Sequence, residues 1–312
     1  MSGAGQIFIG GCDRSGTTML ASMLGGHSRV LCLPESHFFQ QFAASGLAGD
    51  ALVSAIEKHP RFELWGVDLS AEDRAELAAQ PGFSAFADLL ARFYARSHGV
   101  AGHEVWVDHA PRNCGRFLTL ARAFPQARFV HMVRDGRAVA NSWMGQDWGP
   151  NNITAVADAW ALRLAQGLSA EAALGDRIVR ISYEEVVADP EVAIRKVAGL
   201  AGIAFEAAML DARGFRLPEH SKDTHSLLTA DSSRGVSSGR LESWRRDLHP
   251  RQIELFESRA GDLLEALGYD PVNVDPQPQT RKEKLRDLGR ELYLGARNIP
   301  RRNRRHGFGT FR

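Results

Sequence analysis

The sequence predicts an α/β fold in which helices cover both faces of a central parallel sheet. Short apolar runs alternate along the chain with segments whose apolar residues follow helical spacing. The runs are apolar throughout rather than at every second residue, which is typical of strands buried on both faces. With 312 residues, the chain is long enough for one large domain or two small ones.

The predicted elements follow one another in strand–helix order. Strands are expected at residues 7–9, 30–32, 105–107, 128–133 and 178–181. Helices are expected from Thr17, after Pro111, from about Asp135, over 152–174, after Tyr183 through Leu200, and over roughly 250–267. Helical segments also fill about 36–98, which predicts a helical insert at about 40–100, and the Ser-, Gly- and Arg-rich segment 214–240 predicts a long surface loop.

The charge of the chain is unevenly distributed. The net charge is only +1, so no overall field favours binding of nucleic acid. From Gln277 to Arg312, however, 11 Lys and Arg residues stand against three Asp and Glu residues. We therefore predict a basic C-terminal tail over 276–312, which either contacts an acidic membrane surface or polyanion or extends freely into solvent.

The cysteine pattern and the hydropathy predict a soluble, cytoplasmic protein. Cys12, Cys32 and Cys114 lie far apart and form no CxxC pair, which speaks against a zinc ribbon or a disulfide framework. No signal peptide is expected at the N-terminus, and no run of about 18 apolar residues predicts a membrane span. No cluster of metal ligands is apparent in the sequence either.

A loop with the composition of an anion site follows the first predicted strand. Gly11 to Thr18 reads Gly-Cys-Asp-Arg-Ser-Gly-Thr-Thr and leads directly into a helix, where backbone N–H groups can surround a phosphate. The glycines fit the Walker A pattern, but Thr17 occupies the place of its lysine. The loop therefore favours a phosphate-like group held by Arg14 and hydroxyls, and it speaks against hydrolysis of ATP or GTP.

A second basic position follows the best predicted strand. Arg134 comes directly after 128–133, and Ser142 lies eight residues further, about two turns along the next helix. Ligands of open α/β sheets bind beyond the carboxyl ends of the strands. A guanidinium and a hydroxyl there suit a dianionic phosphate. The alternative is that Arg134 simply forms a salt bridge with Asp135.

Together these motifs resemble the sulfotransferases that use 3′-phosphoadenosine 5′-phosphosulfate (PAPS). Arg before Ser-Gly-Thr-Thr resembles the protein-tyrosine and bacterial branch of that family, and the resemblance runs from about residue 5 to 270. It implies a P-loop-like three-layer fold over 1–275 with the helical insert shaping an acceptor pocket. It also implies that the 5′-phosphosulfate contacts Arg14, Ser15, Gly16, Thr17 and Thr18, and that the 3′-phosphate contacts Arg134 and Ser142.

Two weaker matches extend the resemblance. Tyr183-Glu184-Glu185 is similar to the family's Tyr-Glu-Asp segment, whose tyrosine approaches the adenine, although a half-buried aromatic residue is an equal interpretation. Ser233-Arg234-Gly235 is similar to a late loop that closes over the nucleotide. The resemblance implies that Arg234 reaches the 3′-phosphate.

The implied reaction is an in-line transfer of a sulfuryl group to an acceptor hydroxyl, with 3′,5′-ADP as the second product. Arg14 would neutralise charge on the leaving oxygen without a metal. Glu35 lies 21 residues after Arg14, like the catalytic glutamate of the tyrosine-sulfating enzymes, and is our preferred base. His109 is the alternative, because Asp108-His109-Ala110-Pro111-Arg112 stands where many relatives have Lys in Asp-Lys-Thr-Pro-Arg.

Other functions compete with this interpretation. A kinase on the same scaffold would need the missing Walker lysine, and a non-catalytic nucleotide-binding scaffold would dock through the basic tail. The acceptor is a hydroxylated molecule, and a carbohydrate, a tyrosyl residue and a small molecule all fit the sequence.

Overall fold

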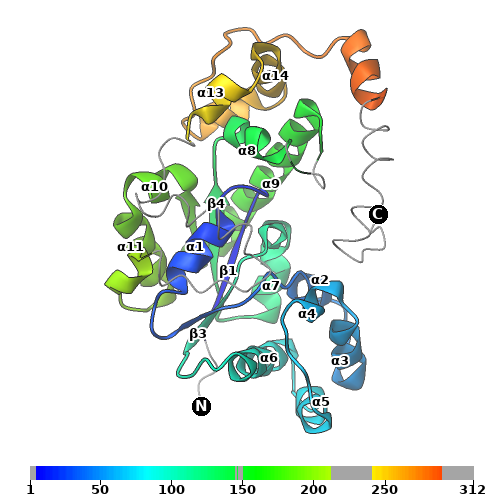
Figure 1. Cartoon of the computed structure of the whole chain (residues 1–312), viewed down its shortest axis with the longest axis vertical. Coiled ribbons are helices and arrows are strands. Elements are labelled where there is room, and N and C mark those ends of the chain that lie inside the picture. The colour runs from blue at the N-terminus through cyan, green and yellow to red at the C-terminus, as the bar shows by residue number, and fades with distance from the viewer. Residues whose placement is uncertain (1–4, 145, 147–149, 212–240, 290–312) are drawn as a thin grey trace. The chain divides into compact units, whose positions relative to one another are not determined.

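The structure is a computed structural model that describes residues 5–144, 146, 150–211 and 241–289. Over these residues the chain forms a five-stranded sheet with the order β2-β3-β1-β4-β5, in which every neighbouring pair is parallel (Figure 1). The strands are β1 (Gly5–Gly11), β2 (Val30–Cys32), β3 (Val105–Asp108), β4 (Arg128–Val133) and β5 (Ile178–Ser182). The predicted parallel α/β sheet flanked by helices is thereby confirmed.

The helices fall largely where the apolar spacing predicts them. Their bounds are α1 (Thr17–Leu24), α2 (Phe38–Phe42), α3 (Gly49–Glu57), α4 (Pro60–Glu63), α5 (Ala71–Ala78), α6 (Phe83–Ser97), α7 (Phe117–Ala123), α8 (Gly136–Trp143), α9 (Ile153–Leu174), α10 (Tyr183–Ala188), α11 (Pro190–Ala201), α13 (Ser243–Asp247) and α14 (Pro250–Ala266). Three short 3-10 helices, η1 (Pro111–Arg116), η2 (Gly175–Arg177) and η3 (Ala207–Leu210), and a helix over residues 281–289 are also described.

A hydrophobic core cluster joins the helices of the predicted insert to the sheet. Phe8 on β1 and Trp106 on β3 pack edge to face with ring centroids 5.3 Å apart. The ring centroids of Phe39 on α2 and Trp106 lie 5.4 Å apart, and those of Trp65 and Phe38 lie 4.9 Å apart. Helices α1 and α11 contact strands of the same sheet outside this cluster. The insert therefore shares its core with the sheet and fixes the segment that follows β2.

Two local features differ from the predicted pattern. The helix expected from Tyr183 to Leu200 is divided into α10 and α11, because Pro190 has no N–H to donate and disfavours helical geometry at Asp189. Asp189 instead adopts φ −145° and caps α11 through Val192. The short helix α13 was not predicted, because five residues are too few to show a period. The predicted loop 214–240 lies outside the described residues.

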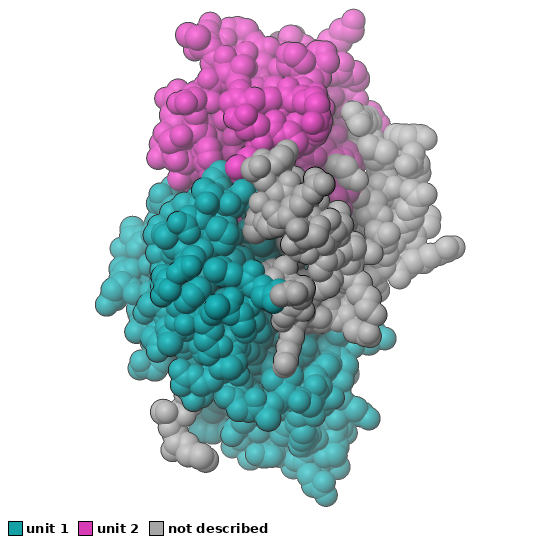
Figure 2. Space-filling model, turned by 60° about the vertical axis from the view of Figure 1, so that its left-hand side comes forward, with its two compact units in different colours: residues 1–11, 16–133, 166–237 teal, residues 12–15, 134–165, 238–312 magenta. Residues whose placement is uncertain are grey.

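The chain divides into two compact units (Figure 2). Unit 1 holds the whole sheet and comprises residues 1–11, 16–133 and 166–237, whereas unit 2 comprises 12–15, 134–165 and 238–312. The polar centre of unit 2 is Arg137, which is 1% exposed and pairs with Asp135 and Glu257. Its guanidinium also lies 4.1 Å from the centroid of a Trp244 ring. The predicted boundary between residues 275 and 276 stays a prediction.

We expect Gly167→Ala to destabilise the protein by about 1–3 kcal/mol. A Cβ at this position of α9 would lie 2.1 Å from two ring atoms of His131, which is 1% exposed and held by a hydrogen bond with Glu171. The matched change Gly199→Ala in α11, where a Cβ would meet nothing within 4 Å, should be neutral or stabilise by up to about 1 kcal/mol. Equal urea midpoints for the two variants would contradict this reasoning.

Candidate functional site

The loop after β1 has the tight geometry that the glycines predict. Gly11 ends the strand beside β4, where a Cβ would lie 2.2 Å from the carbonyl oxygen of Met132. Gly16 adopts φ 95° immediately before α1, in the region that only glycine occupies without strain. The Ser15 N–H donates to the Cys12 carbonyl at 3.1 Å, which closes the turn between them. The loop is thus folded back on itself before the first N–H groups of α1.

Within unit 2, the two predicted arginines lie next to each other. The Arg134 guanidinium donates to the carbonyl oxygen of Arg14 at 3.0 Å, and Arg14 Nε donates to Ser142 Oγ at 3.0 Å. Arg134 is 8% exposed, and its own carbonyl accepts a hydrogen bond from Trp160. Ser142 lies on α8, as the eight-residue spacing predicts. Arg14 is thereby joined by hydrogen bonds to Arg134 and Ser142, which lie 120 and 128 residues further along the chain.

Asp135 has a structural role in this arrangement. Its carboxylate accepts from the Arg137 backbone N–H at the start of α8 and pairs with the Arg137 guanidinium. Asp135 therefore caps α8 and compensates the charge of the buried Arg137.

Within unit 1, Tyr183 lies against the glycine of the loop. A Cβ on Gly16 would come within 2.7 Å of the Tyr183 ring, which is 8% exposed at the start of α10. The hydroxyls that follow in the chain differ in exposure, since Thr17 is buried and Thr18 is half-buried. Ser15 in unit 2 is 1% exposed, and its hydroxyl has no hydrogen-bond partner among the described residues. Such a buried donor is expected to meet a ligand or water.

A second polar cluster of unit 1 lies beyond β2 and β3. These strands are parallel neighbours, so the residues that follow them leave the same edge of the sheet. Glu35 pairs with His37 at 3.2 Å and with Arg61 at 3.7 Å, and its side chain is 23% exposed. Partial burial alone would raise the pKa of Glu35, but the hydrogen bond with His37 and the charges of His109, His37 and Arg61 lower it to about 2. Glu35 is therefore a carboxylate at any working pH.

Asp108 holds the turn that carries Glu35. Its buried carboxylate accepts from the Ser36 N–H and from the Ser36 hydroxyl, both at 3.0 Å, and from the Asn113 amide at 3.0 Å. Burial raises the pKa of Asp108, although these hydrogen bonds act in the opposite direction. Since the neighbour of Glu35 in the chain is fixed at two atoms, the position of Glu35 is fixed too.

His109 lies in the same region but is almost inaccessible. The side chain is 1% exposed, and neither ring nitrogen has a well-aligned hydrogen-bond partner among the described residues, although the Leu33 backbone lies close enough to favour the charged form. Burial lowers the pKa of His109, against the nearby carboxylates of Glu35 and Asp108. The imidazole is therefore neutral near pH 7 and can accept a proton.

Two residues of this region escaped the sequence analysis. Neither His37 nor Arg61 was singled out in the sequence, yet both lie beside Glu35. Among the described residues, the only ones other than glycine with positive φ are Arg14 at 70° and His37 at 54°. Backbone strain of this kind is frequent at functional sites, but no sequence pattern predicts it.

The predicted Arg234 lies outside the described residues. Among the residues that the structure describes, no group of three or more His, Cys, Asp or Glu residues is placed to hold a metal ion.

The fold and the loop together define a class of protein. A glycine-containing turn joins a central strand of a parallel sheet to a helix, which is the P-loop-like architecture. No helix of the described residues is long and apolar enough to span a membrane.

The family model described as "Sulfotransferase family" matches residues 6–207. This chain therefore belongs to the sulfotransferase family and is an enzyme, a sulfotransferase. Protein-tyrosine sulfotransferase A of Caenorhabditis elegans is 23% identical over 292 residues, which cover 89% of this chain and 70% of the relative. Nodulation protein NoeE of Sinorhizobium fredii is 26% identical over 292 residues, with 84% and 65% of the two chains covered.

Solved structures share the fold. The sulfotransferase domain of the olefin synthase from Synechococcus superposes with a TM-score of 0.58 at 20% identity and covers 85% of this chain and 95% of that domain. The sulfotransferase domain of the curacin biosynthetic pathway gives 0.56 at 17% identity, with 86% and 99% covered.

Proposed function

We propose that the enzyme takes a sulfuryl group from PAPS, transfers it to an acceptor hydroxyl and releases 3′,5′-ADP. The contact of Arg134 with the Arg14 backbone, and of Arg14 with Ser142, carries this proposal. A nucleotide with two separate anionic ends needs two cationic groups within reach of one molecule. Had the two arginines been far apart in unit 2, one nucleotide would not reach both.

Different residues are proposed to bind the two anionic ends of PAPS. Arg14, Ser15, Gly16, Thr17 and Thr18 are proposed to hold the 5′-phosphosulfate, because the loop presents N–H groups, hydroxyls and a guanidinium in sequence. Arg134 and Ser142 are proposed to hold the 3′-phosphate. The Arg14–Ser142 hydrogen bond would then be exchanged for bonds to the two phosphate groups, which charge-assisted contacts make favourable. Tyr183, beside Gly16, is proposed to lie against the adenine, and Arg234 to reach the 3′-phosphate.

In the chemical step the acceptor oxygen attacks sulfur, and the bond between sulfur and the 5′-phosphate oxygen breaks. Arg14 stabilises the charge that develops on the leaving oxygen. We propose that Glu35 receives the acceptor proton, because its carboxylate is ionised, partly exposed and held in place through Ser36 and Asp108. His109 is the alternative base, since its neutral imidazole is more basic but buried.

The acceptor is proposed to be a hydroxyl of a carbohydrate, a tyrosyl residue or a small molecule. Names of relatives point to protein tyrosine in one case and to a nodulation protein in another. The cluster around Glu35 offers both a carboxylate and the cationic Arg61, so it can contact polar acceptors of either charge.

We expect 3′,5′-ADP to raise the thermal unfolding midpoint of the protein. At a concentration of 100 times the dissociation constant, a ligand that binds only the folded state stabilises it by about 2.7 kcal/mol. Differential scanning fluorimetry checks this, with 5′-AMP as the control that lacks the 3′-phosphate and ATP with magnesium as the kinase ligand. Protection by ATP with magnesium and none by 3′,5′-ADP would contradict the proposed donor and favour a kinase.

We propose a cytoplasmic location on the cysteine pattern. All three cysteines lie within the described residues, all are buried, and none forms a disulfide bond. This pattern suits a reducing compartment. Cell fractionation tests the proposal, and recovery of the protein with a secreted fraction would contradict it.

A further inference from the structure

A helix near the end of the described chain exposes leucine side chains. Residues 281–289 form this helix, which Thr280 and Glu283 cap reciprocally: Thr280 N–H donates to the Glu283 carboxylate at 2.8 Å, and the Glu283 N–H donates to the Thr280 hydroxyl at 3.3 Å. Leu285 is 70% exposed and Leu288 is 54% exposed. At a spacing of three residues they lie on the same face of the helix. Two neighbouring exposed leucines form a small apolar patch, which distinguishes them from single exposed apolar residues such as Leu162.

Basic residues flank the leucines, and acidic residues occupy the other side. The exposed basic side chains of this helix are Arg281, Lys282, Lys284 and Arg286. Glu283 and Asp287 are half-buried, and with roughly 100° per residue they lie far from Leu285 around the helix axis. Both carboxylates are engaged, Glu283 with Arg251 and Asp287 with Gln279 at 2.6 Å. Arg286 also pairs with Asp287 at 3.5 Å, although its side chain is 72% exposed. The outward face therefore combines the leucines with exposed basic side chains.

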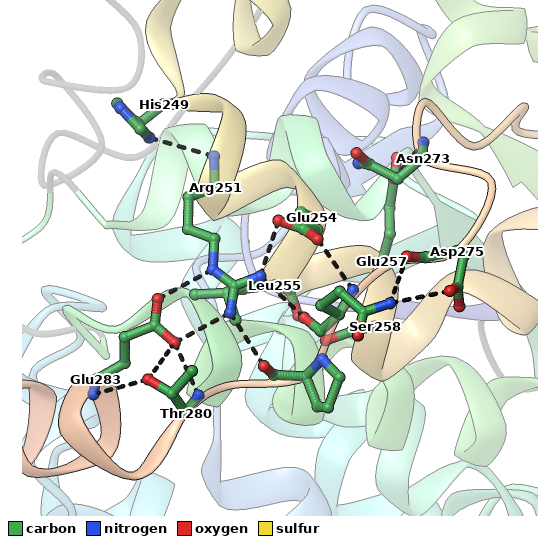
Figure 3. Close-up of polar contacts among 12 residues, drawn as sticks. His249, Arg251, Glu254, Leu255, Glu257, Ser258, Asn273, Asp275, Thr280 and Glu283 are labelled. Atoms are coloured by element: carbon green, nitrogen blue, oxygen red, sulfur yellow. Dashed lines mark hydrogen bonds and ion pairs between the residues drawn. The ribbon is translucent and has the colours of Figure 1, made fainter.

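Arg251 of α14 fixes the orientation of this helix (Figure 3). Its Nε and Nη2 donate to the two oxygens of Glu283 at 2.9 and 3.0 Å. Its Nη1 and Nη2 also donate to the carbonyls of Gln277 and Pro278, both at 3.0 Å. The hydrogen bond from Arg251 contributes most to lowering the pKa of Glu283 to about 2, so the pair persists at any working pH. The acidic side is thereby held against α14, and the leucine side faces outward.

We propose that this helix, with Leu285 and Leu288 inserted and its basic side chains at the headgroups, binds an anionic lipid surface. An amphipathic helix rich in Lys and Arg beside an apolar face is the form that lies in a membrane interface. Nucleic acid or another polyanion would satisfy the basic residues but leave both leucines in water. Pairing of this helix with the same helix of a second copy would bring like charges together.

Co-sedimentation of the full chain with vesicles tests the proposal. The protein should pellet with vesicles of phosphatidylcholine and phosphatidylglycerol, remain in solution with phosphatidylcholine alone, and dissociate as salt is raised. The double variant Leu285→Ser/Leu288→Ser should bind the anionic vesicles roughly tenfold or more weakly, because each leucine loses the free energy of burial in the lipid. The matched control is Leu162→Ser, which alters an exposed leucine of α9 and should bind like the unaltered protein.

The outcomes separate this surface from the proposed catalytic function. All three substituted leucines are exposed, so each variant should keep its thermal midpoint and its sulfuryl-transfer rate with a soluble acceptor. Equal vesicle binding by the double variant and the unaltered protein would overturn the proposal. Binding to heparin or an oligonucleotide without any binding to anionic vesicles would also overturn it and would assign the basic residues to a polyanion.

Discussion

Replacing Arg14 by alanine should lower kcat/KM for sulfuryl transfer by about 10²–10³-fold. The proposed role of its guanidinium is to meet the charge that develops on the leaving phosphate oxygen, and a donor placed for that charge acts more strongly in the transition state than in the bound substrate. The effect should therefore fall mainly on kcat. Transfer of label from PAPS to a hydroxylated acceptor measures it.

Because Arg14 has a positive φ, a second substitution at this position is needed to separate loss of the side chain from backbone strain. With φ 70°, alanine at this position retains the strain of the left-handed region, whereas glycine adopts it freely. Arg14→Gly should therefore fold at least as well as Arg14→Ala and show the same loss of turnover. Arg29→Ala, which removes an exposed arginine paired with Glu104, is the matched control and should keep full activity. Unchanged turnover in both Arg14 variants would refute the proposed role.

Glu35→Gln should reduce kcat by about 10²–10⁴-fold, because the amide keeps the shape of the side chain but cannot accept the proton. Since the pKa of Glu35 is about 2, its carboxylate is the reactive form throughout the range from mildly acidic to neutral pH. Glu35 as base thus predicts a kcat/KM that does not fall on the acid side of neutrality. Glu104→Gln, an exposed glutamate, serves as the matched control.

His109 as base predicts a different pH profile. Its imidazole must be neutral to accept a proton, so activity would fall as the pH drops through a pKa that burial places below the usual histidine range. His109→Asn would then remove both the activity and that acid limb. A profile with such an acid limb, together with near-normal turnover of Glu35→Gln, would assign the base to His109 and contradict the role given to Glu35.

The lowered pKa of Glu35 also has a consequence for stability. The folded-state value of about 2 lies below the ordinary value of 4.5, so the ionised carboxylate stabilises the protein above about pH 4.5 and loses this contribution as the pH falls toward 2. Glu35→Gln should therefore lower the thermal unfolding midpoint at neutral pH. The turnover of this variant should be measured at a temperature well below that midpoint.

Much of the fold was predictable from the sequence, because buried strands and helices have recognisable patterns of apolar residues. Strands such as 128–133 are apolar throughout, since helices cover both faces of the sheet, and α1 stops at the glycines that were expected to end it. Asp189-Pro190 was visible in the sequence as well, but its effect as a break between α10 and α11 was not inferred. Arg14 and Arg134 were predicted to act together because each follows the carboxyl end of a strand, and Ser142 was predicted to join Arg134 from about two turns along the next helix.

The residues that surround Glu35 could not be predicted from the sequence. Glu35 and His109 were singled out, but His37, Arg61 and the double hydrogen bond from Ser36 to Asp108 were not. Ser36 and Asp108 are 72 residues apart and meet because β2 and β3 pair in one register. Nothing local in either segment encodes that register.

By itself, therefore, the sequence determined most of the elements and their parallel arrangement, because periodic apolar spacing and glycine-rich turns act over a few residues. Only the tertiary structure decided that the pKa of Glu35 is lowered, that His109 is buried, and that Arg251 holds the helix over residues 281–289 with its leucines exposed. Those properties depend on distances between groups far apart in the chain, since desolvation and Coulomb interactions follow proximity in space rather than order in sequence.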